Sequence, residues 1–362
     1  MRNGLCPAKK NAMIRNLISK LCTAVLCLVA ASSCNEIKSE LSKIEGSTGT
    51  QGKPYEVLVV CNMPEWNGPV GEQLRAQLSR PIEGPMQSDP CFDLMHITEA
   101  NYKGIMLSYR NIILLDIDAK HTKSSLMMQY NVYATPQLIL TIKSPSVQAA
   151  ADYLQQNSHL LPSMLEKAER DRTVALARKH HNATLSQLIE LEFGMRLTVP
   201  EGYTLRAQND DFLWASYEFP NASQGFFIYS YDPKTMRNLT PVAARNLFAR
   251  RIPGPSDGSY MTTVTKIPTA TGDEYTPLEP EMREMTVNGR KWLEMRGLWE
   301  LENDFMGGPF VSYTTYNEAK GRMVVIDCYV YSPDKTVGKR RFLRPLEHLV
   351  WLADFASPTP TK

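Results

Sequence analysis

The sequence lacks a hydrophobic run long enough to cross a membrane as a helix. Its clearest apolar segment, residues 21–31, has eleven apolar or small residues, whereas a spanning helix needs about 20. Arg15 and Lys20 precede this segment, and the small residues Ser32 and Ser33 follow it. A basic start, a short apolar core and a small-residue end predict a cleaved secretory signal. The alternative is a buried helix, which should show a polar face that this run does not have.

The residue after this segment is Cys34, so the end of the run resembles a bacterial lipobox. Cleavage at a lipobox would leave Cys34 as the first residue and attach diacylglycerol to its thiol. Ala31 stands three residues before the cysteine, where leucine is usual. The resemblance implies a lipoprotein signal peptide over residues 1–33 and a membrane anchor at Cys34. The polar, small residues 34–53 would be a flexible tether.

The chain is also poor in clustered positive charge. Residues 1–33 carry five Lys or Arg and no acid, so their removal changes the net charge from +2 to −3. One basic triplet remains, Lys339-Arg340-Arg341, and such a triplet is more often a solvated helix face than a polyanion site. Nucleic acid is therefore excluded as the expected partner.

Cysteine is scarce once the signal is removed. Besides Cys34, the remaining cysteines are Cys61, Cys91 and Cys328. An oxidising periplasm would permit one disulfide among these three, and the sequence does not say which. Their spacing fits neither a zinc nor an iron–sulfur site, so we expect no cofactor.

Residues 54–182 are predicted to form an α/β domain. Runs rich in Ile, Leu and Val predict strands, and amphipathic spacing predicts a helix between the first two. Ser144-Pro145 predicts a helix start and Ser163 with Glu166 a capping box. We expect a sheet that mixes parallel and antiparallel strands. The predicted strands are residues 55–61, 92–98, 111–117 and 137–143. The predicted helices are residues 69–79, a helix that starts at Ser144-Pro145 and continues to 161, and a helix that begins at Ser163.

Residues 183–356 are predicted to form an α+β domain, an antiparallel sheet with covering helices. Asn288-Gly289 between two apolar runs predicts a hairpin with a type I′ turn. Gly194 should end a helix over residues 184–193. Thr240-Pro241 should begin another, with Ala244, Leu247 and Phe248 facing inward. Further hairpins are predicted over residues 212–231 and 311–331, a closing helix over 342–353, and a disordered tail over 357–362.

Several long runs together resemble an uncharacterised family of envelope lipoproteins from Bacteroidetes-type bacteria, defined as a domain of unknown function. The resemblance covers nearly all of the chain after the signal. It implies a lipoprotein with no known activity, so it assigns no catalytic residue. The runs are GPMQSDPCFDLMHI (84–97), RNIILLDID (110–118), YATPQLIL (133–140), QGFFIYSY (224–231), IPGPSDGSYM (252–261), RGLWELENDFMGGPFVSY (296–313) and VYSPDKTVGKRRFLRPLEHL (330–349).

Two patterns could carry catalysis. Residues 254–258 fit the G-x-S-x-G pattern of a hydrolase, with Ser256 as nucleophile and His348 as the downstream histidine. The pattern requires a strand before the serine and a helix after it, and here that order is reversed. A glycine-rich turn is the alternative.

A second pattern could hold a metal. Asp116 and Asp118 lie on one face at the end of a predicted strand, and His121 follows three residues later. The alternative is a strand that ends in solvated acids. Adjacent helical residues such as His180 and His181 point about 100° apart and do not readily chelate one ion.

Residues 296–309 are the candidate binding segment. The segment joins two predicted strands and combines aromatic residues, methionine, arginine and two glycines, types enriched at binding surfaces. The alternative is a tight interdomain loop with aromatic residues that fill the core. The candidate residues are Arg296, Trp299, Asp304, Phe305, Met306, Gly307 and Gly308.

Together these patterns predict a lipid-anchored component of the cell envelope that binds or assembles with something and does not catalyse a reaction. The alternative is a periplasmic hydrolase or a metal-dependent enzyme. Asn35 is not the aspartate that resembles an inner-membrane retention signal, so we expect the outer membrane, facing the periplasm. Expected partners are the membrane, through the lipid, and an envelope protein or a small ligand.

Overall fold

The computed structural model describes residues 49–82, 89–220, 222–269, 272, 274–333 and 339–355. The predicted signal, Cys34, the tail over 357–362 and most of the predicted tether lie outside the described residues. The chain divides into two compact units. The N-terminal unit comprises residues up to Arg75 and Asp93–Ser158; the C-terminal unit comprises Ala76–Phe92 and His159–Lys362.

The N-terminal unit contains a five-stranded sheet in the order β2-β1-β3-β5-β4. Four strands are parallel, and β4 pairs antiparallel with β5 at the edge. The expected mixed sheet is therefore confirmed, although the sequence reading missed β4. The strands are β1 (Glu56–Val60), β2 (Asp93–Ile97), β3 (Asn111–Ile117), β4 (Ser125–Tyr130) and β5 (Leu138–Ser144).

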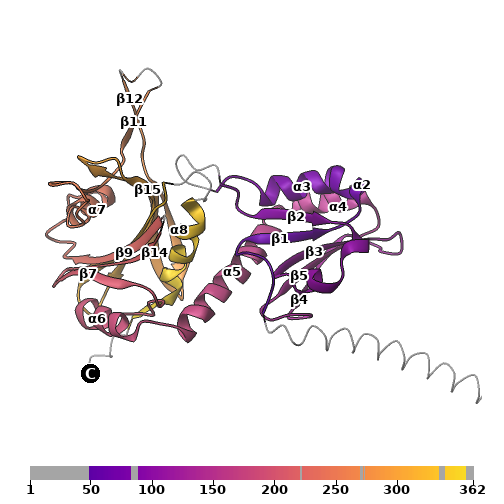
Figure 1. Ribbon diagram of the computed structural model, residues 1–362, viewed down its shortest axis with the longest axis horizontal. Coiled ribbons are helices and arrows are strands. Elements are labelled where there is room, and N and C mark those ends of the chain that lie inside the picture. The colour runs from indigo at the N-terminus through magenta and orange to yellow at the C-terminus, as the bar shows by residue number, and fades with distance from the viewer. Residues whose placement is uncertain are drawn as a thin grey trace, which may run out of the picture. The chain divides into compact units, whose positions relative to one another are not determined.

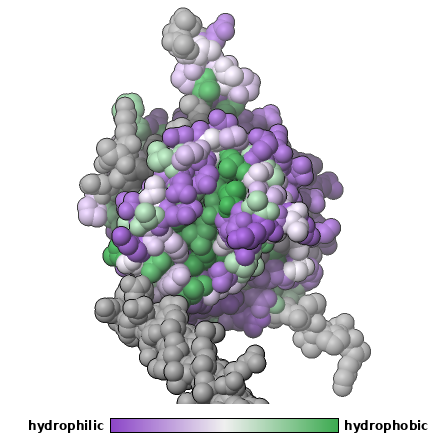
Figure 2. Space-filling model, turned by 90° about the vertical axis from the view of Figure 1, so that its right-hand side faces the viewer, coloured by the Kyte–Doolittle hydropathy of each residue, from purple (hydrophilic) through white to green (hydrophobic). Residues whose placement is uncertain are grey.

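The sheet of the N-terminal unit is covered on both faces, as parallel strands require. Helices lie together on one side of the sheet in Figure 1, and short 3₁₀ segments carry Tyr102 and Met106 against Leu58 and Ile112 in the core. Figure 2 faces this unit and shows a strip of hydrophobic residues bordered by hydrophilic ones. The helices are α2 (Met63–Asn67), α3 (Pro69–Leu78) and α4 (Val147–Gln156), with 3₁₀ turns at Glu99–Asn101 and Gly104–Ser108.

Two helix boundaries differ from the sequence reading. The N-cap of α4 is Ser146, whose side chain accepts a hydrogen bond from the backbone N–H of Ala149, whereas Ser144 ends β5. Helix α5 (Leu160–Lys179) begins before the predicted capping residue Ser163, because Pro162 lies in the first turn, where its missing N–H costs nothing. The compact units divide after Ser158, and α5 packs against the C-terminal core through Ala177.

The C-terminal unit is built on a curled antiparallel sheet in the order β10-β14-β15-β16-β9-β8-β7, with β13 also paired to β14. Asn288 and Gly289 both have positive φ angles, as the predicted type I′ hairpin requires. The strands of this sheet are β7 (Thr204–Asn209), β8 (Phe212–Phe219), β9 (Ala222–Tyr231), β10 (Tyr260–Thr263), β13 (Glu281–Val287), β14 (Arg290–Glu302), β15 (Gly307–Asn317) and β16 (Arg322–Tyr331).

Helices and short sheets complete the C-terminal unit. Gly194 ends α6 with a φ of 64°, and Thr240 caps α7, both as predicted. No helix among the described residues is long and apolar enough to cross a membrane. The remaining elements are α6 (Ala183–Phe193), α7 (Pro241–Ala249), α8 (Lys339–Glu347), the 3₁₀ turn Leu349–Leu352, and the two-stranded sheets β6 (Met195–Leu197) with β17 (Ala353–Phe355) and β11 (Lys266–Pro268) with β12 (Tyr275–Pro277).

Both faces of the curled sheet are buried. Successive side chains along each strand point to opposite faces, and each face carries its own hydrophobic cluster. Along β9, Phe226 and Ile228 belong to the first cluster, with α6 and α8, while Phe227 and Tyr229 belong to the second, with α7. The broad layout is therefore as expected: an N-terminal α/β region and a C-terminal antiparallel sheet with helices. The face covered by α7 carries the site described next.

Candidate functional site

A pocket of about 730 Å³ opens on the face of the curled sheet that carries the second cluster. This volume lies within the range of small-molecule sites. Its walls come from strands and from the loops that border them, all in the C-terminal unit. The lining residues are Trp214, Glu218, Phe219, Pro220, Ala222, Ser223, Ile252, Pro253, Gly254, Pro255, Met261, Trp299, Leu301, Met306, Tyr329, Tyr331 and Pro333.

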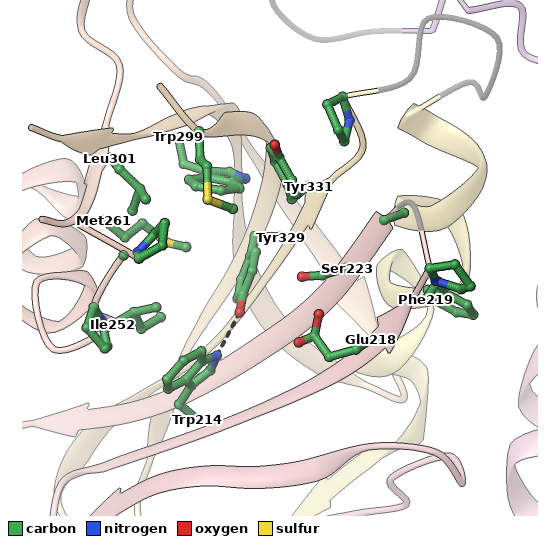
Figure 3. A pocket seen from close by; sticks show the side chains of 17 residues that line it. Trp214, Glu218, Phe219, Ser223, Ile252, Met261, Trp299, Leu301, Tyr329 and Tyr331 are labelled. Carbon is green, nitrogen blue, oxygen red and sulfur yellow. Dashed lines mark hydrogen bonds between the residues drawn. The ribbon is translucent and has the colours of Figure 1, made fainter. Parts of the chain in front are cut away.

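The floor of the pocket is aromatic. Trp214 from β8, Trp299 from β14 and Tyr329 from β16 point to the same face, because the pleat of each strand sends alternate side chains to that side (Figure 3). The indole Nε1 of Trp214 donates a hydrogen bond of 2.7 Å to the hydroxyl of Tyr329. Burial raises the pKa of Tyr329 above its ordinary value, so this hydroxyl stays neutral at physiological pH.

A glycine makes room for the Tyr329 ring. Gly225 on β9 is the direct cross-strand partner of Tyr329. A Cβ atom at Gly225 would lie 2.5 Å from the Tyr329 hydroxyl, closer than any real contact allows. The absence of a side chain at this position lets Tyr329 cross β9 and reach Trp214 on the next strand.

The second tryptophan of the floor is fixed in a similar way. Trp299 is 2 % exposed, and its Nε1 donates to the backbone carbonyl of Val330 at 3.1 Å. A Cβ at Gly308 would lie 2.0 Å from that carbonyl oxygen and 3.2 Å from Nε1. Both tryptophans thus have their polar atom satisfied, and their apolar surfaces are left to form the wall.

The rim is held by a contact between two loops. The hydroxyl of Ser256 donates to Asp304 at 2.6 Å, which links the segment before β10 to the turn between β14 and β15. The hydrogen bond from Ser256 lowers the pKa of Asp304. Next to this link, Met306 lines the pocket, while the side chain of Phe305 is fully exposed.

One end of the pocket is polar. Glu218 and Ser223 are cross-strand partners, and Figure 3 shows their side chains projecting into the cavity beside Tyr329. Glu218 Oε1 accepts a hydrogen bond of 2.7 Å from Ser216 and lies 3.6 Å from the guanidinium of Arg206. The pocket can therefore accommodate an apolar group along its floor and a polar group at this end.

The structure separates the residues of the predicted binding segment. Trp299 and Met306 line the pocket, Asp304 holds its rim, and Gly308 allows the close approach of β16. Arg296 faces the other side of the sheet, where it pairs with Glu294 and, at 2.7 Å, with Glu347. Residues three apart on a strand point to opposite faces.

Gly307 and Phe305 complete the segment. A Cβ at Gly307 would lie 2.8 Å from the carbonyl oxygen of Trp299, so this position also has no room for a side chain. Phe305 is not among the residues that line the pocket, and its side chain is fully exposed at the turn between β14 and β15.

The three metal candidates do not form one site. Asp116 pairs with His121 at 3.1 Å and with Lys143 at 3.7 Å. Asp118 accepts a hydrogen bond from the backbone of Lys120, which lowers the pKa of its carboxyl. Among the described residues, no group of three His, Cys, Asp or Glu could hold a metal ion.

The two residues of the hydrolase pattern have different partners. Ser256 is exposed and bonds to Asp304. His348 is 3 % exposed and its Nε2 lies 3.4 Å from Glu166 on α5. Ser256 and His348 therefore do not contact each other, so His348 is not placed to accept the proton of the Ser256 hydroxyl.

The cysteines that follow the predicted lipid site are single thiols. Cys61 and Cys328 are buried, Cys91 is partly exposed, and all three are free. Burial, followed by the charges of Glu65 and Glu99, raises the pKa of Cys61 to about 12. Such a thiol is unreactive at neutral pH.

Sequence reasoning missed most of the pocket. The sequence places several lining residues in predicted hairpins, and a hairpin prediction does not give the face that each side chain occupies. The residues are Trp214, Glu218, Tyr329 and Tyr331. A signal was present, because β8 and β16 place aromatic residues at every second position toward one end. Gly225, opposite one of these aromatics, was a second signal.

Comparisons with known proteins show similarity to two domain families and indicate no activity. Residues 182–351 match the model of a domain of unknown function, DUF4837, and residues 50–177 match that of a second, DUF8532. No curated protein matches the sequence. Among solved structures, the human StarD13 (DLC2) lipid transfer and protein localization domain matches with 10% identity, covering 46% of this chain and 94% of its own. Its TM-score of 0.13 is too low to indicate a common fold.

Proposed function

We propose, for a chain whose two regions belong to domain families of unknown function, that it is a non-catalytic binding protein whose C-terminal pocket takes an apolar or amphipathic small ligand. The observation that carries this proposal is the aromatic floor formed by Trp214, Trp299 and Tyr329 in a cavity of about 730 Å³. Apolar walls with a few placed polar groups are typical of ligand sites.

The setting that we propose is the cell envelope. The apolar run over residues 21–31 and the lipobox-like Cys34 support a lipid anchor, and Asn35 supports the outer membrane with the protein facing the periplasm. A protein held at a membrane by its N-terminus would meet amphipathic ligands at high local concentration. Mass spectrometry of the native protein should find diacylglycerol on Cys34, and an unmodified Cys34 with residues 1–33 still attached would refute the anchor.

The binding proposal is tested by filling the pocket. Ser223→Phe places a ring in the cavity, and N-phenyl-1-naphthylamine, a neutral fluorescent probe, reports occupancy. We expect the probe to bind the unmodified protein and to bind Ser223→Phe at least about tenfold more weakly, a loss of roughly 1.4 kcal/mol. The matched control is Thr204→Phe, which adds the same ring on the exposed strand β7 and should leave binding unchanged. Equal binding to both variants would refute the proposal.

A second candidate function is the docking of an envelope protein at the β14–β15 turn. Its supporting observation is Phe305, whose side chain is fully exposed beside the pocket rim, since exposed aromatics are enriched in binding hot spots. Phe305→Ser should remove an in-cell crosslink at this turn, while Tyr275→Ser, an exposed aromatic on β12, should not. Loss with both variants or with neither would refute a specific contact at Phe305.

A further inference from the structure

The charge of the pocket wall restricts the ligand. Of the described residues that line the pocket, Glu218 is the one charged side chain, and none is Lys, Arg or His. A fatty acid or another anionic amphiphile would therefore bring its charge to a wall whose described residues include one carboxylate and no cation. The two like charges would repel, and water reduces the repulsion in part, because the Glu218 side chain is 54 % exposed.

The Glu218 carboxylate retains capacity for a further partner. Both of its contacts in the described structure, from Ser216 at 2.7 Å and Arg206 at 3.6 Å, are made to Oε1. The Arg206 contact exceeds the usual length of a charge-assisted hydrogen bond, so it neutralises the carboxylate only in part. The second oxygen, Oε2, has no partner among the described residues.

Aromatic rings line the cavity next to this carboxylate, which is otherwise exposed to solvent. Trp214 precedes Glu218 by four residues on β8 and so points to the same face. Figure 3 shows Tyr329 and Tyr331 bordering the same cavity, and both lie on β16, which is separated from β8 by β9. A carboxylate next to indole and phenol rings is the combination that attracts organic cations, because the faces of aromatic rings are electron-rich.

We infer that the pocket selects amphiphiles with a positively charged amine or quaternary ammonium group, which lies at Glu218 while the apolar body lies along Trp299, Met261 and Leu301. This inference rests on the proposed function, because it requires that the pocket binds a small ligand. It adds to the proposed function the sign of the ligand's charge and the residue that recognises that charge, Glu218.

Three probes with the same ten-carbon chain test the inference: decyltrimethylammonium, decanol and decanoate. Each is titrated below its micelle concentration and displaces N-phenyl-1-naphthylamine from the full chain. We expect the cation to bind at least about tenfold more tightly than decanoate, with decanol between them. Glu218→Gln should weaken cation binding about two- to fivefold, since the carboxylate is 54 % exposed and water screens its charge. Decanol binding should be unchanged, because the substitution removes charge but keeps shape.

The control variant is Glu190→Gln, which makes the same charge change at an exposed position of α6. It should preserve the preference for the cation. Equal binding of the three probes, or the same loss of cation affinity in both variants, would overturn the inference while leaving the proposed function intact. If decanol also failed to displace the neutral probe, the proposed function itself would fall. Unchanged decanol binding by Glu218→Gln shows that the variant is folded.

Discussion

A buried ion pair positions α7 against the sheet, and breaking it should strongly destabilise the C-terminal unit. Arg245 on α7 and Asp327 on β16 are both 0 % exposed. The guanidinium donates to both carboxylate oxygens, at 2.8 and 3.1 Å, and to the Thr263 hydroxyl at 2.9 Å. It also stacks 3.7 Å from the ring of Phe310.

The perturbation is Arg245→Met, which keeps an apolar chain but leaves Asp327 buried without its cation. Removing one partner of a buried pair costs roughly 3–5 kcal/mol, because the remaining charge has lost both water and its partner. For a unit of this size, that loss lowers the melting temperature by about 6–20 °C. The effect on the pocket should follow, since the segment after α7 contributes Ile252 and Pro253 to the rim.

The assay is urea unfolding followed by tryptophan fluorescence, because four of the five tryptophans lie in the C-terminal unit. A double variant, Arg245→Met with Asp327→Leu, should recover at least half of the lost stability, because replacing a whole buried pair with apolar residues is often neutral. A loss below about 1 kcal/mol for Arg245→Met, or a double variant less stable than the single one, would refute the reasoning.

The same variant should also respond to pH. Burial raises the pKa of Asp327, opposed by Arg245, so without Arg245 the rise is larger. A carboxyl whose pKa is higher in the folded state than in the unfolded state binds more protons when folded. The free energy of unfolding therefore falls as the pH rises from the pKa of the unfolded state toward that of the folded state. Arg245→Met should therefore be less destabilised at pH 5 than at pH 7.5. A penalty that did not change with pH would show that Asp327 is not the source of the loss.

Two further predictions concern the thiols and the pocket floor. In the chain from residue 35 onward, iodoacetamide should label the partly exposed Cys91 in the native state, and Cys61 and Cys328 only after unfolding; native labelling of Cys61 at a comparable rate, read by mass spectrometry, would contradict its burial. Gly225→Val should displace Tyr329, lower stability by about 1–3 kcal/mol and abolish binding of the neutral probe; unchanged probe binding would mean that this ring does not shape the floor.

Local signals in the sequence predicted most elements of the C-terminal unit. Asn288-Gly289 fixes a turn, Gly194 ends a helix and Thr240 caps one, and each of these effects acts within a few residues. The inward face of α7 was wrong in part, since Leu247 is 45 % exposed and Arg245 is buried. Arg245 enters the core because Asp327 meets it there, and that partner lies 82 residues away in the sequence.

Local sequence likewise identified only part of the pocket wall, because the other lining residues come from segments far apart in the chain. The segment 296–309 was identified by its composition, and Trp299 and Met306 do line the pocket. Composition does not show which face a side chain occupies, so Arg296 was grouped with Trp299 although it pairs with Glu347 on the opposite side. Glu218 and Tyr329 lie at the pocket because of the register in which β8, β9 and β16 pair. That register cannot be read from any one of the three segments alone.

The pocket is a built feature of the sheet rather than a packing defect. Closing an apolar cavity lowers the free energy, because the side chains around it regain van der Waals contacts. A cavity therefore stays open only when its walls cannot move inward. Trp214 donates a hydrogen bond to Tyr329, and Trp299 donates one to the Val330 carbonyl. Gly225 leaves the space that the Tyr329 ring occupies. Collapse of the walls would break these two hydrogen bonds, of which the one from Trp299 is buried. The contacts that fix the rings therefore also keep the cavity open for a ligand.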